Sequence, residues 1–185
     1  LSNHTPLTDK IKPALLDKHQ LIVKMDSLTF ETKPTKWKEW LSESEKKSLK
    51  TLNKYYIDSS YYKTYTSDAN GNINKKTVPF VPDVANQEFE DLKIVIQLLK
   101  ENNCEISFVM QPLNPYYYKN LESYTPIMDS IDNLMSRNEL ENNYLNLFVT
   151  KKTNYKPGIL RDVMHFSELG WMTVNQFLYE RHFAK

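Results

Sequence analysis

An alternation of helix-like and strand-like segments after residue 86 constrains the fold of this sequence more than any other feature. Apolar residues recur at the spacing of one helix face from Phe89 to Leu99, and a short, nearly all-apolar stretch follows at residues 106–110. That stretch ends at Gln111-Pro112. A short apolar run of this kind is typical of a strand that is buried on both faces of a parallel sheet. The pattern therefore predicts a helix followed by a buried strand.

The same alternation continues to the end of the chain. Residues 124–135 have the spacing of an amphipathic helix, and residues 144–149 read as a second strand. Ser167 precedes a final helical pattern and is a good N-cap residue. The inner face of this last helix is predicted to carry Trp171, Val174 and Leu178. The order helix, strand, helix, strand, helix predicts an α/β fold with a doubly wound parallel sheet.

Residues 1–82 read as an irregular helical and hairpin elaboration, and residues 83–185 as the α/β portion, the two forming one domain in the intact protein. The dipeptide Asn70-Gly71 predicts a β-hairpin between residues 61–66 and 73–78, because both turn positions tolerate positive φ. Prolines at 79 and 82 then favour an extended connector.

Residues 33–55 show roughly helical spacing of large apolar side chains. We expect these side chains in the core: Trp37, Trp40, Leu41 and Leu52. The stretch SESEKKS at residues 42–48 is expected to form a solvated helix face.

Composition excludes some classes of partner and of cross-link. The chain has 24 Lys and Arg against 23 Asp and Glu, so its net charge of +1 predicts no electrostatic grip on nucleic acid or another polyanion. A single cysteine cannot form an internal disulfide. The sequence has no run of about 18 apolar residues that would span a membrane. The first residue is Leu1, which predicts further sequence upstream.

The most informative motif is Asp162-Val163-Met164-His165, directly before the last helix. A histidine can take the proton of an attacking hydroxyl when a carboxylate holds its ring in one tautomer, and three residues of separation allow that contact. Because ligands bind outside the carboxyl ends of parallel strands, we expect this motif to converge with residues 111–114.

These residues also carry a family resemblance. The stretch FVMQPLN at residues 108–114, the block DVMHFSELGW at residues 162–171 and the acidic helix start at Glu88–Leu92 resemble the carboxyl-terminal portion of the DltD proteins. The resemblance is good from residue 86 to 185 and poor over the first 80 residues. DltD proteins are D-alanyl transfer proteins of lipoteichoic acid biosynthesis and belong to the broad SGNH/GDSL hydrolase class.

The resemblance implies a three-layer, doubly wound sheet of the SGNH-hydrolase type and a set of site residues. Asp162 becomes the orienting acid, His165 the general base, and Asn114 a substrate-binding residue. Neither a metal nor a diffusible cofactor is implied. The family's nucleophilic serine lies in an amino-terminal Gly-x-Ser block that this sequence lacks, so the chain alone is expected to be inactive.

The function implied is D-alanylation of lipoteichoic or teichoic acid through a serine acyl ester. The expected partners are teichoic acid, a D-alanyl donor and other membrane proteins of the D-alanylation pathway, with no role for nucleic acid. The expected location is the extracytoplasmic face of the Gram-positive cell membrane, through an anchor upstream of Leu1. Two alternatives stay open, namely a generic SGNH esterase or O-acyltransferase on wall glycans, and a non-catalytic scaffold that binds a wall polymer.

Overall fold

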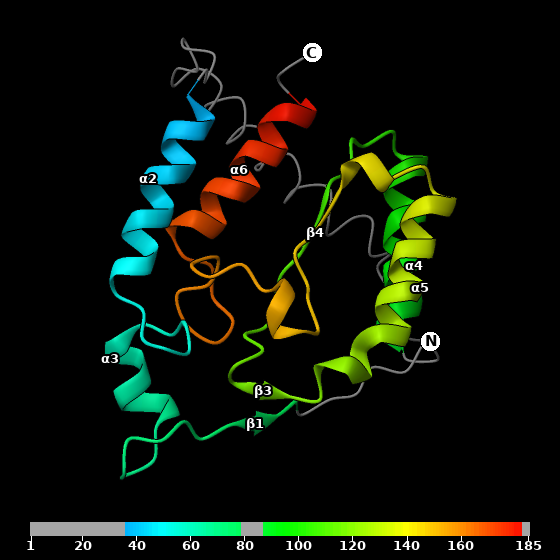
Figure 1. Ribbon diagram of the computed structural model, residues 1–185. Helices are drawn as coiled ribbons and strands as arrows, with labels where there is room; N and C mark the ends of the chain where they lie inside the picture. The colour runs from blue at the N-terminus through cyan, green and yellow to red at the C-terminus, as the bar shows by residue number, and fades with distance from the viewer. Residues whose placement is uncertain (1–35, 79–86, 183–185) are drawn as a thin grey trace, which may run out of the picture. The chain divides into compact units, whose positions relative to one another are not determined.

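The computed structural model of the protein describes residues 36–78 and 87–182. The chain divides into two compact units, Leu1–Trp37 and Lys38–Lys185, and the second holds nearly all of the described residues. The predicted domain boundary at residue 82 lies outside the described residues. In chain order the elements are α2 (Trp37–Lys50), α3 (Ser59–Tyr61), the π-helical turn η1 (Tyr62–Thr66), β1 (Lys76–Thr77), α4 (Gln87–Glu101), β2 (Phe108–Met110), β3 (Tyr118–Lys119), the 3-10 turn η2 (Leu121–Tyr124), α5 (Thr125–Arg137), the 3-10 turn η3 (Glu141–Asn143), β4 (Tyr144–Asn146), the 3-10 turn η4 (Lys152–Asn154) and α6 (Glu168–His182) (Figure 1).

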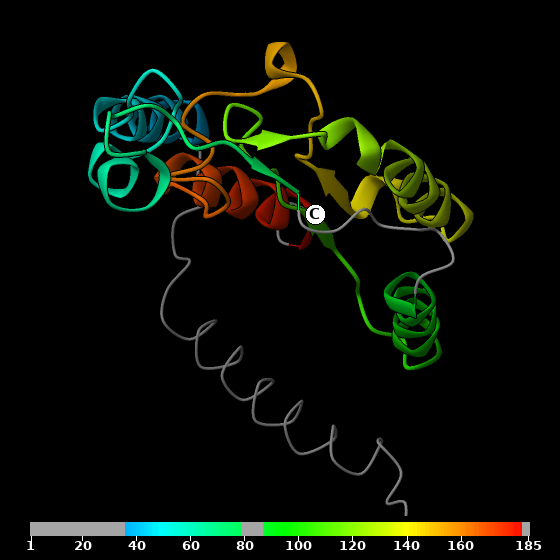
Figure 2. The same cartoon turned by 90° about the horizontal axis from the view of Figure 1, so that it is seen from below.

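Short parallel strand pairs organise the mixed α/β fold. The two strands predicted from the sequence, β2 and β4, pair in parallel with Val109 opposite Leu145, and α5 lies between them in the chain. A second parallel pair joins β1 to β3, which lie side by side in Figures 1 and 2. Within the described residues these are two separate two-stranded sheets. Parallel strands joined through helices confirm the α/β prediction at this coarse level.

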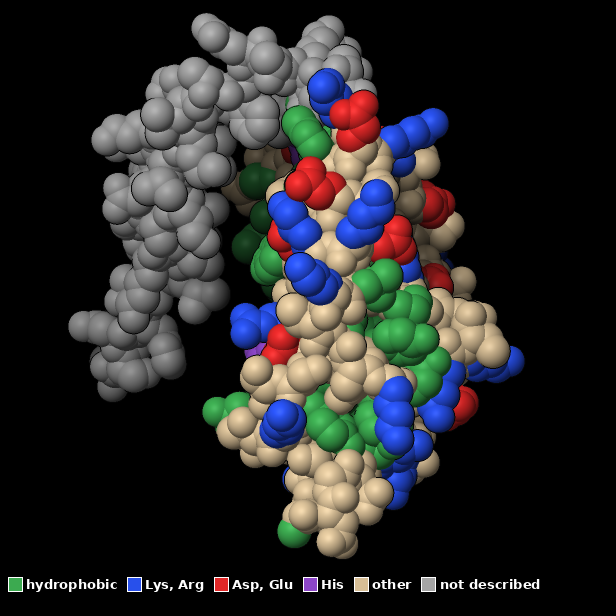
Figure 3. All heavy atoms as spheres, turned by 60° about the vertical axis from the view of Figure 1, so that its left-hand side comes forward, with side chains coloured by type: hydrophobic (Ala, Val, Ile, Leu, Met, Phe, Trp, Pro, Cys, Tyr) green, Lys and Arg blue, Asp and Glu red, His purple; other side chains and the backbone are tan. Residues whose placement is uncertain are grey.

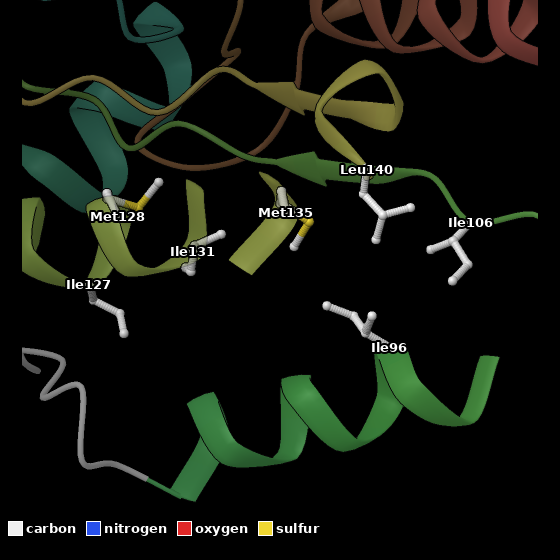
Figure 4. Close-up of a cluster of buried hydrophobic side chains, with 7 residues drawn as sticks. All are labelled: Ile96, Ile106, Ile127, Met128, Ile131, Met135 and Leu140. Carbon is white, nitrogen blue, oxygen red and sulfur yellow. The ribbon is translucent and has the colours of Figure 1, made fainter. Parts of the chain in front are cut away.

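The largest apolar cluster joins α4 and α5 to the β2–β4 pair. Ile96 of α4 faces the buried side chains of α5, among them Ile131 and Met135 (Figure 4). Phe108 and Tyr144 of the two strands pack against the same cluster. The helical spacing read from the sequence thus produces two amphipathic helices whose apolar faces are covered. Each fully buried aliphatic side chain contributes about 1.5–3 kcal/mol to stability.

Helix α6 begins where the sequence predicts. The Ser167 hydroxyl accepts a hydrogen bond from the backbone N–H of Gly170 at 3.2 Å, which caps the first turn. A methyl group on Gly170 would lie 2.3 Å from the Ile159 carbonyl oxygen, so only glycine allows this turn to lie so close to the preceding loop. Val174 is buried as predicted, but Trp171 is 58% exposed and rests edge-on against Phe166. The prediction for Trp171 is wrong because the loop before α6, and not the inner helix face, provides its contact.

The buried and exposed residues of helix α2 also differ from the prediction. Ser44 and Ser48, expected on a solvated face, are buried against the start of α6, where Ser48 donates to Ser167 at 3.1 Å. Trp40, expected in the core, is 37% exposed. Small serine side chains allow α6 to approach this face closely, which bulky aromatic residues would prevent. The rest of α2 carries interspersed positive and negative side chains (Figure 3). Lys47 and Glu43 of this helix form an ion pair at 3.4 Å.

The predicted hairpin forms only at its turn. Asp68 accepts backbone hydrogen bonds from Asn70 and Asn72, Gly71 has a φ of +75°, and a single antiparallel bridge closes the turn. The first predicted arm is helical instead, because Asp58 caps α3 by accepting from the N–H groups of the next turn. The second arm contains β1, which pairs with β3. The local turn chemistry is confirmed, whereas a distant segment decides the strand pairing.

Candidate active site

The loop from Leu160 to Phe166 places the acid–histidine motif and is anchored by buried aliphatic side chains. Leu160 is fully buried in one apolar cluster and Val163 is buried in another, on either side of Asp162 in the chain. The loop is closed on itself by a backbone hydrogen bond of 2.8 Å from the Arg161 N–H to the His165 carbonyl. Because both anchors are buried, the backbone around Asp162 is fixed before any substrate binds.

Within this loop Asp162 and His165 form the predicted pair. His165 Nδ1 lies 2.9 Å from Oδ2 and 3.0 Å from Oδ1 of the Asp162 carboxylate. Oδ1 also accepts from the backbone N–H groups of Met164 at 3.0 Å and His165 at 2.9 Å. The Asp162 side chain is 8% exposed and that of His165 is 69% exposed. The carboxylate is therefore held in place by the turn, and the imidazole stands at the surface.

This arrangement leaves the far nitrogen of the ring free to act. A carboxylate on Nδ1 favours the tautomer with its proton on Nδ1, so that Nε2 carries the lone pair. Within residues 36–78 and 87–182, Nε2 of His165 has no hydrogen-bond partner. The ring can accept a proton there from a hydroxyl group that approaches from solvent.

The loop meets the carboxyl end of β2, as the sequence predicts. The Gln111 side chain, directly after the strand, donates to the Met164 carbonyl, and the Asn114 backbone N–H donates to the Val163 carbonyl at 3.0 Å. The carbonyl of Arg161 accepts from the Asp58 N–H at 2.8 Å. The predicted convergence is confirmed, and a third segment around residue 58, which the sequence did not indicate, also holds the loop.

Asn114 is the most enclosed polar residue near the motif, with 0% exposure. Its amide nitrogen donates to the carbonyls of Tyr55 at 3.1 Å and Tyr56 at 3.3 Å, and its oxygen accepts from the Tyr116 N–H at 2.8 Å. Tyr56 has a φ of +56°, a left-handed conformation that costs about 1–3 kcal/mol outside glycine. All these contacts are to the backbone, so the amide braces a strained turn behind the loop, and a substrate contact for Asn114 stays a prediction.

Tyrosines surround the carboxylate at longer range. Burial raises the pKa of Tyr118, and electrostatic interactions with Tyr117, Tyr61 and Asp162 raise it further. Burial likewise raises the pKa of Tyr61, again with a contribution from Asp162. These hydroxyl groups therefore stay protonated near neutral pH and lie within electrostatic reach of the Asp162 carboxylate.

A second histidine, which the sequence indicates only as a residue near a frayed terminus, has a similar set of partners at the other end of β2. His182 Nε2 lies 2.9 Å from the Ser107 hydroxyl, and Nδ1 lies 2.9 Å from the Glu105 carboxylate. Ser107 immediately precedes β2, so this group lies at the amino end of a parallel strand. Ligands of α/β sheets bind at the opposite ends. These contacts join the last turn of α6 to β2, and the 75-residue separation of Ser107 and His182 gives no signal in the sequence.

Residues 36–78 and 87–182 offer neither a metal cluster nor a membrane span. Among them no three or more His, Cys, Asp or Glu side chains gather in a way that could hold a metal ion. Nor is any helix in that part of the chain long and apolar enough to cross a membrane.

The fold and site together define a class of protein. Its members are mixed α/β proteins in which a buried carboxylate contacts an exposed histidine, beyond the carboxyl end of a parallel strand. A family model described as DltD protein matches residues 3–184, so the chain belongs to the DltD family. The match begins far earlier than the motifs at residues 86–185 indicate. No curated protein and no solved structure matches the chain. The family has a role in the D-alanylation of teichoic acid in the Gram-positive cell envelope.

Proposed function

We propose that this chain supplies the general base and its orienting acid to a D-alanyl transfer protein that esterifies teichoic or lipoteichoic acid. His165 is the base and Asp162 is the acid that holds its ring. The observation that carries the proposal is the contact of 2.9 Å between Asp162 Oδ2 and His165 Nδ1, combined with the exposure of the ring. An imidazole held in this way can abstract the proton of a hydroxyl at neutral pH.

The proposed reaction has two acyl-transfer steps that use the same histidine. In the first, a serine oxygen attacks the carbonyl carbon of the D-alanyl donor, Nε2 takes the serine proton, and the leaving group departs with that proton. In the second, Nε2 takes the proton of an acceptor hydroxyl, that oxygen attacks the acyl ester, and the proton returns to the serine. Asp162 stabilises the imidazolium form in both steps.

The serine itself is the part of this proposal that the sequence leaves unassigned. Ser27, Ser59 and Ser60 lack the preceding glycine of the family's Gly-x-Ser block. Ser59 donates its hydroxyl hydrogen to the Thr51 carbonyl at 3.0 Å, and the N–H of Ser60 binds the helix-capping Asp58. We infer that the attacking hydroxyl comes from a residue outside residues 1–185.

The finer features implied by the family complete the proposal. They are a three-layer SGNH-type sheet, a membrane anchor upstream of Leu1, an extracytoplasmic location and partnership with membrane proteins of the same pathway. The parallel pairing of β2 with β4 and the helices packed on it support such a sheet. The anchoring of the motif beyond the end of β2 supports a ligand site there.

The direct test is His165→Ala in the intact protein, with D-alanyl esters on the acceptor polymer measured by release in mild base. Loss of esterification with an unchanged thermal unfolding midpoint supports the assignment. Retained esterification removes His165 from the mechanism. The same assay with an O-acetylated wall glycan separates D-alanyl transfer from generic esterase activity, because both reactions would use the same two residues. Polymer binding without either activity would favour the scaffold alternative.

A further inference from the structure

A pocket of about 460 Å³ gathers lysines from three separate segments of the chain. Its wall includes Lys75 just before β1, Lys119 at the end of β3, and Lys151 and Lys152 at the start of η4. The parallel register that sets Thr77 opposite Lys119 brings the first two segments together. Figure 1 shows η4 near the β1–β3 pair, and the shared pocket lining places them around one space.

These ammonium groups have little negative charge to neutralise them. Glu122 is the acidic residue on the pocket wall, so the lining carries four positive charges and one negative. None of the four lysines makes an ion pair with a described residue. The pKa of Lys75 is lowered, first by the charge of Lys152 and then by burial. Like charges held close together gain stability when an anion binds between them.

The other groups on the wall fit a polymer that carries both phosphates and hydroxyl groups. Thr150, Thr153 and Asn120 offer hydrogen-bonding groups, while Pro115 and Tyr118 offer apolar surface for a carbon backbone. Lysines from several segments can each contact a different anionic group. They therefore suit a polymer with repeated phosphates better than a ligand with a single carboxylate.

We propose that this lysine pocket binds the phosphodiester groups of an anionic polyol-phosphate polymer and so holds the acceptor chain near His165. The inference rests on the proposed function for the identity of the polymer. The binding itself is measured without any acyl transfer, so the two can fail separately.

The pocket and the acid–histidine loop are joined by one tight turn. Asn114 donates through its backbone N–H to Val163 of the loop, and its carbonyl accepts from the N–H groups of Tyr117 and Tyr118 at 3.1 and 2.9 Å. Pro115 and Tyr118 then line the pocket. Tyr118 of the pocket wall also lies within electrostatic reach of Asp162. A polymer held in the pocket by its phosphates would therefore have its position along the chain set before one of its hydroxyl groups reaches the base.

The test is the affinity of the intact protein for a short, soluble poly(glycerol phosphate), measured by titration calorimetry at two salt concentrations. The variant Lys75→Gln/Lys152→Gln should weaken binding about tenfold or more and make the dependence on salt shallower, because fewer phosphates are neutralised. The matched control is Lys76→Gln/Lys156→Gln, which removes the same charge from exposed lysines outside the pocket and should change affinity less than about twofold. Equal weakening by both variants would overturn the pocket, since only net charge would then matter.

Two further measurements decide between sources of the phosphate and between the two proposals. Vesicles of phosphatidylglycerol should bind both double variants equally; selective loss of vesicle binding with polymer binding intact would assign the pocket to lipid headgroups and overturn the inference. His165→Ala should bind the polymer with unchanged affinity. Esterification that survives His165→Ala would remove the proposed base, but polymer binding that depends on Lys75 and Lys152 would still establish the pocket.

Discussion

The two histidine groups at opposite ends of β2 have the same chemical parts and different settings. His165 contacts a buried carboxylate and has a 69% exposed ring, whereas His182 contacts an exposed carboxylate and has a 22% exposed ring that faces the Ser107 hydroxyl. The first group can receive a reactant. The second joins a helix end to a strand. Distances alone therefore do not mark a reactive site, because burial of the acid and access to the base decide which histidine can react.

The largest expected effect separates the two histidines. His165→Ala in the intact protein should lower the rate of D-alanyl ester formation by about 10²–10⁴-fold, the usual contribution of a general base. His182→Ala should leave this rate within about twofold, and lower stability through loss of its contacts. Both variants are measured by ester formation and thermal unfolding. A larger loss of rate in His182→Ala than in His165→Ala would show that the reactive histidine is His182.

The next effect concerns the carboxylate that orients His165. Asp162→Asn keeps an oxygen that can accept from the N–H groups of Met164 and His165 but removes the charge. We therefore expect a loss of rate of up to about 10⁴-fold at nearly unchanged stability. Asp162→Ala also removes the acceptor of the turn and should lower the free energy of unfolding by a further ~1 kcal/mol. Ester formation and urea unfolding are measured for both variants. They separate the role of the Asp162 charge in catalysis from the role of its oxygen in stabilising the turn. Equal stability of both variants would show that the turn does not depend on Asp162.

A smaller effect tests the brace behind the first histidine. Asn114→Ala removes the donors to the Tyr55 and Tyr56 carbonyls, and should lower the free energy of unfolding by about 2–3 kcal/mol because buried carbonyls lose their partners. The matched control, exposed Asn74→Ala, should change it by less than about 0.5 kcal/mol. Urea unfolding checks both. Similar values would mean that solvent reaches the turn and that Asn114 does not hold it.

The smallest effect concerns the second histidine group. Ser107→Ala removes one hydrogen bond and should lower the free energy of unfolding by about 1 kcal/mol with no change in ester formation. A serine-reactive fluorophosphonate should not label Ser107. Labelling of wild type that is lost in Ser107→Ala would show that this group is a reactive site and would end the distinction drawn between the two ends of β2.

Features set by neighbours in the sequence are predictable. The amphipathic helices α4 and α5, the Ser167 cap and the Asp162–His165 contact depend on residues within one or two turns of each other. Features that depend on distant segments are not. The arm at residues 73–78 is predicted to pair with residues 61–66, yet its strand β1 pairs with β3. Ser44 and Ser48 are expected on a solvated face, yet the start of α6 covers them.

The lysine pocket shows the same limit for charge. The net charge of +1 predicts no electrostatic attraction to a polyanion. This prediction overlooks the lysine pocket because a sum over the sequence does not record which charges are neighbours in space. By itself the sequence determined helices α2, α4, α5 and α6, the parallel strand pair and the acid three residues before the histidine. The tertiary structure alone decided that residues 75, 119 and 152 meet, that Asn114 stands behind the loop and that His182 faces Ser107. The reason is that periodicity and capping act over one helical turn, whereas strand pairing and burial join residues at any separation.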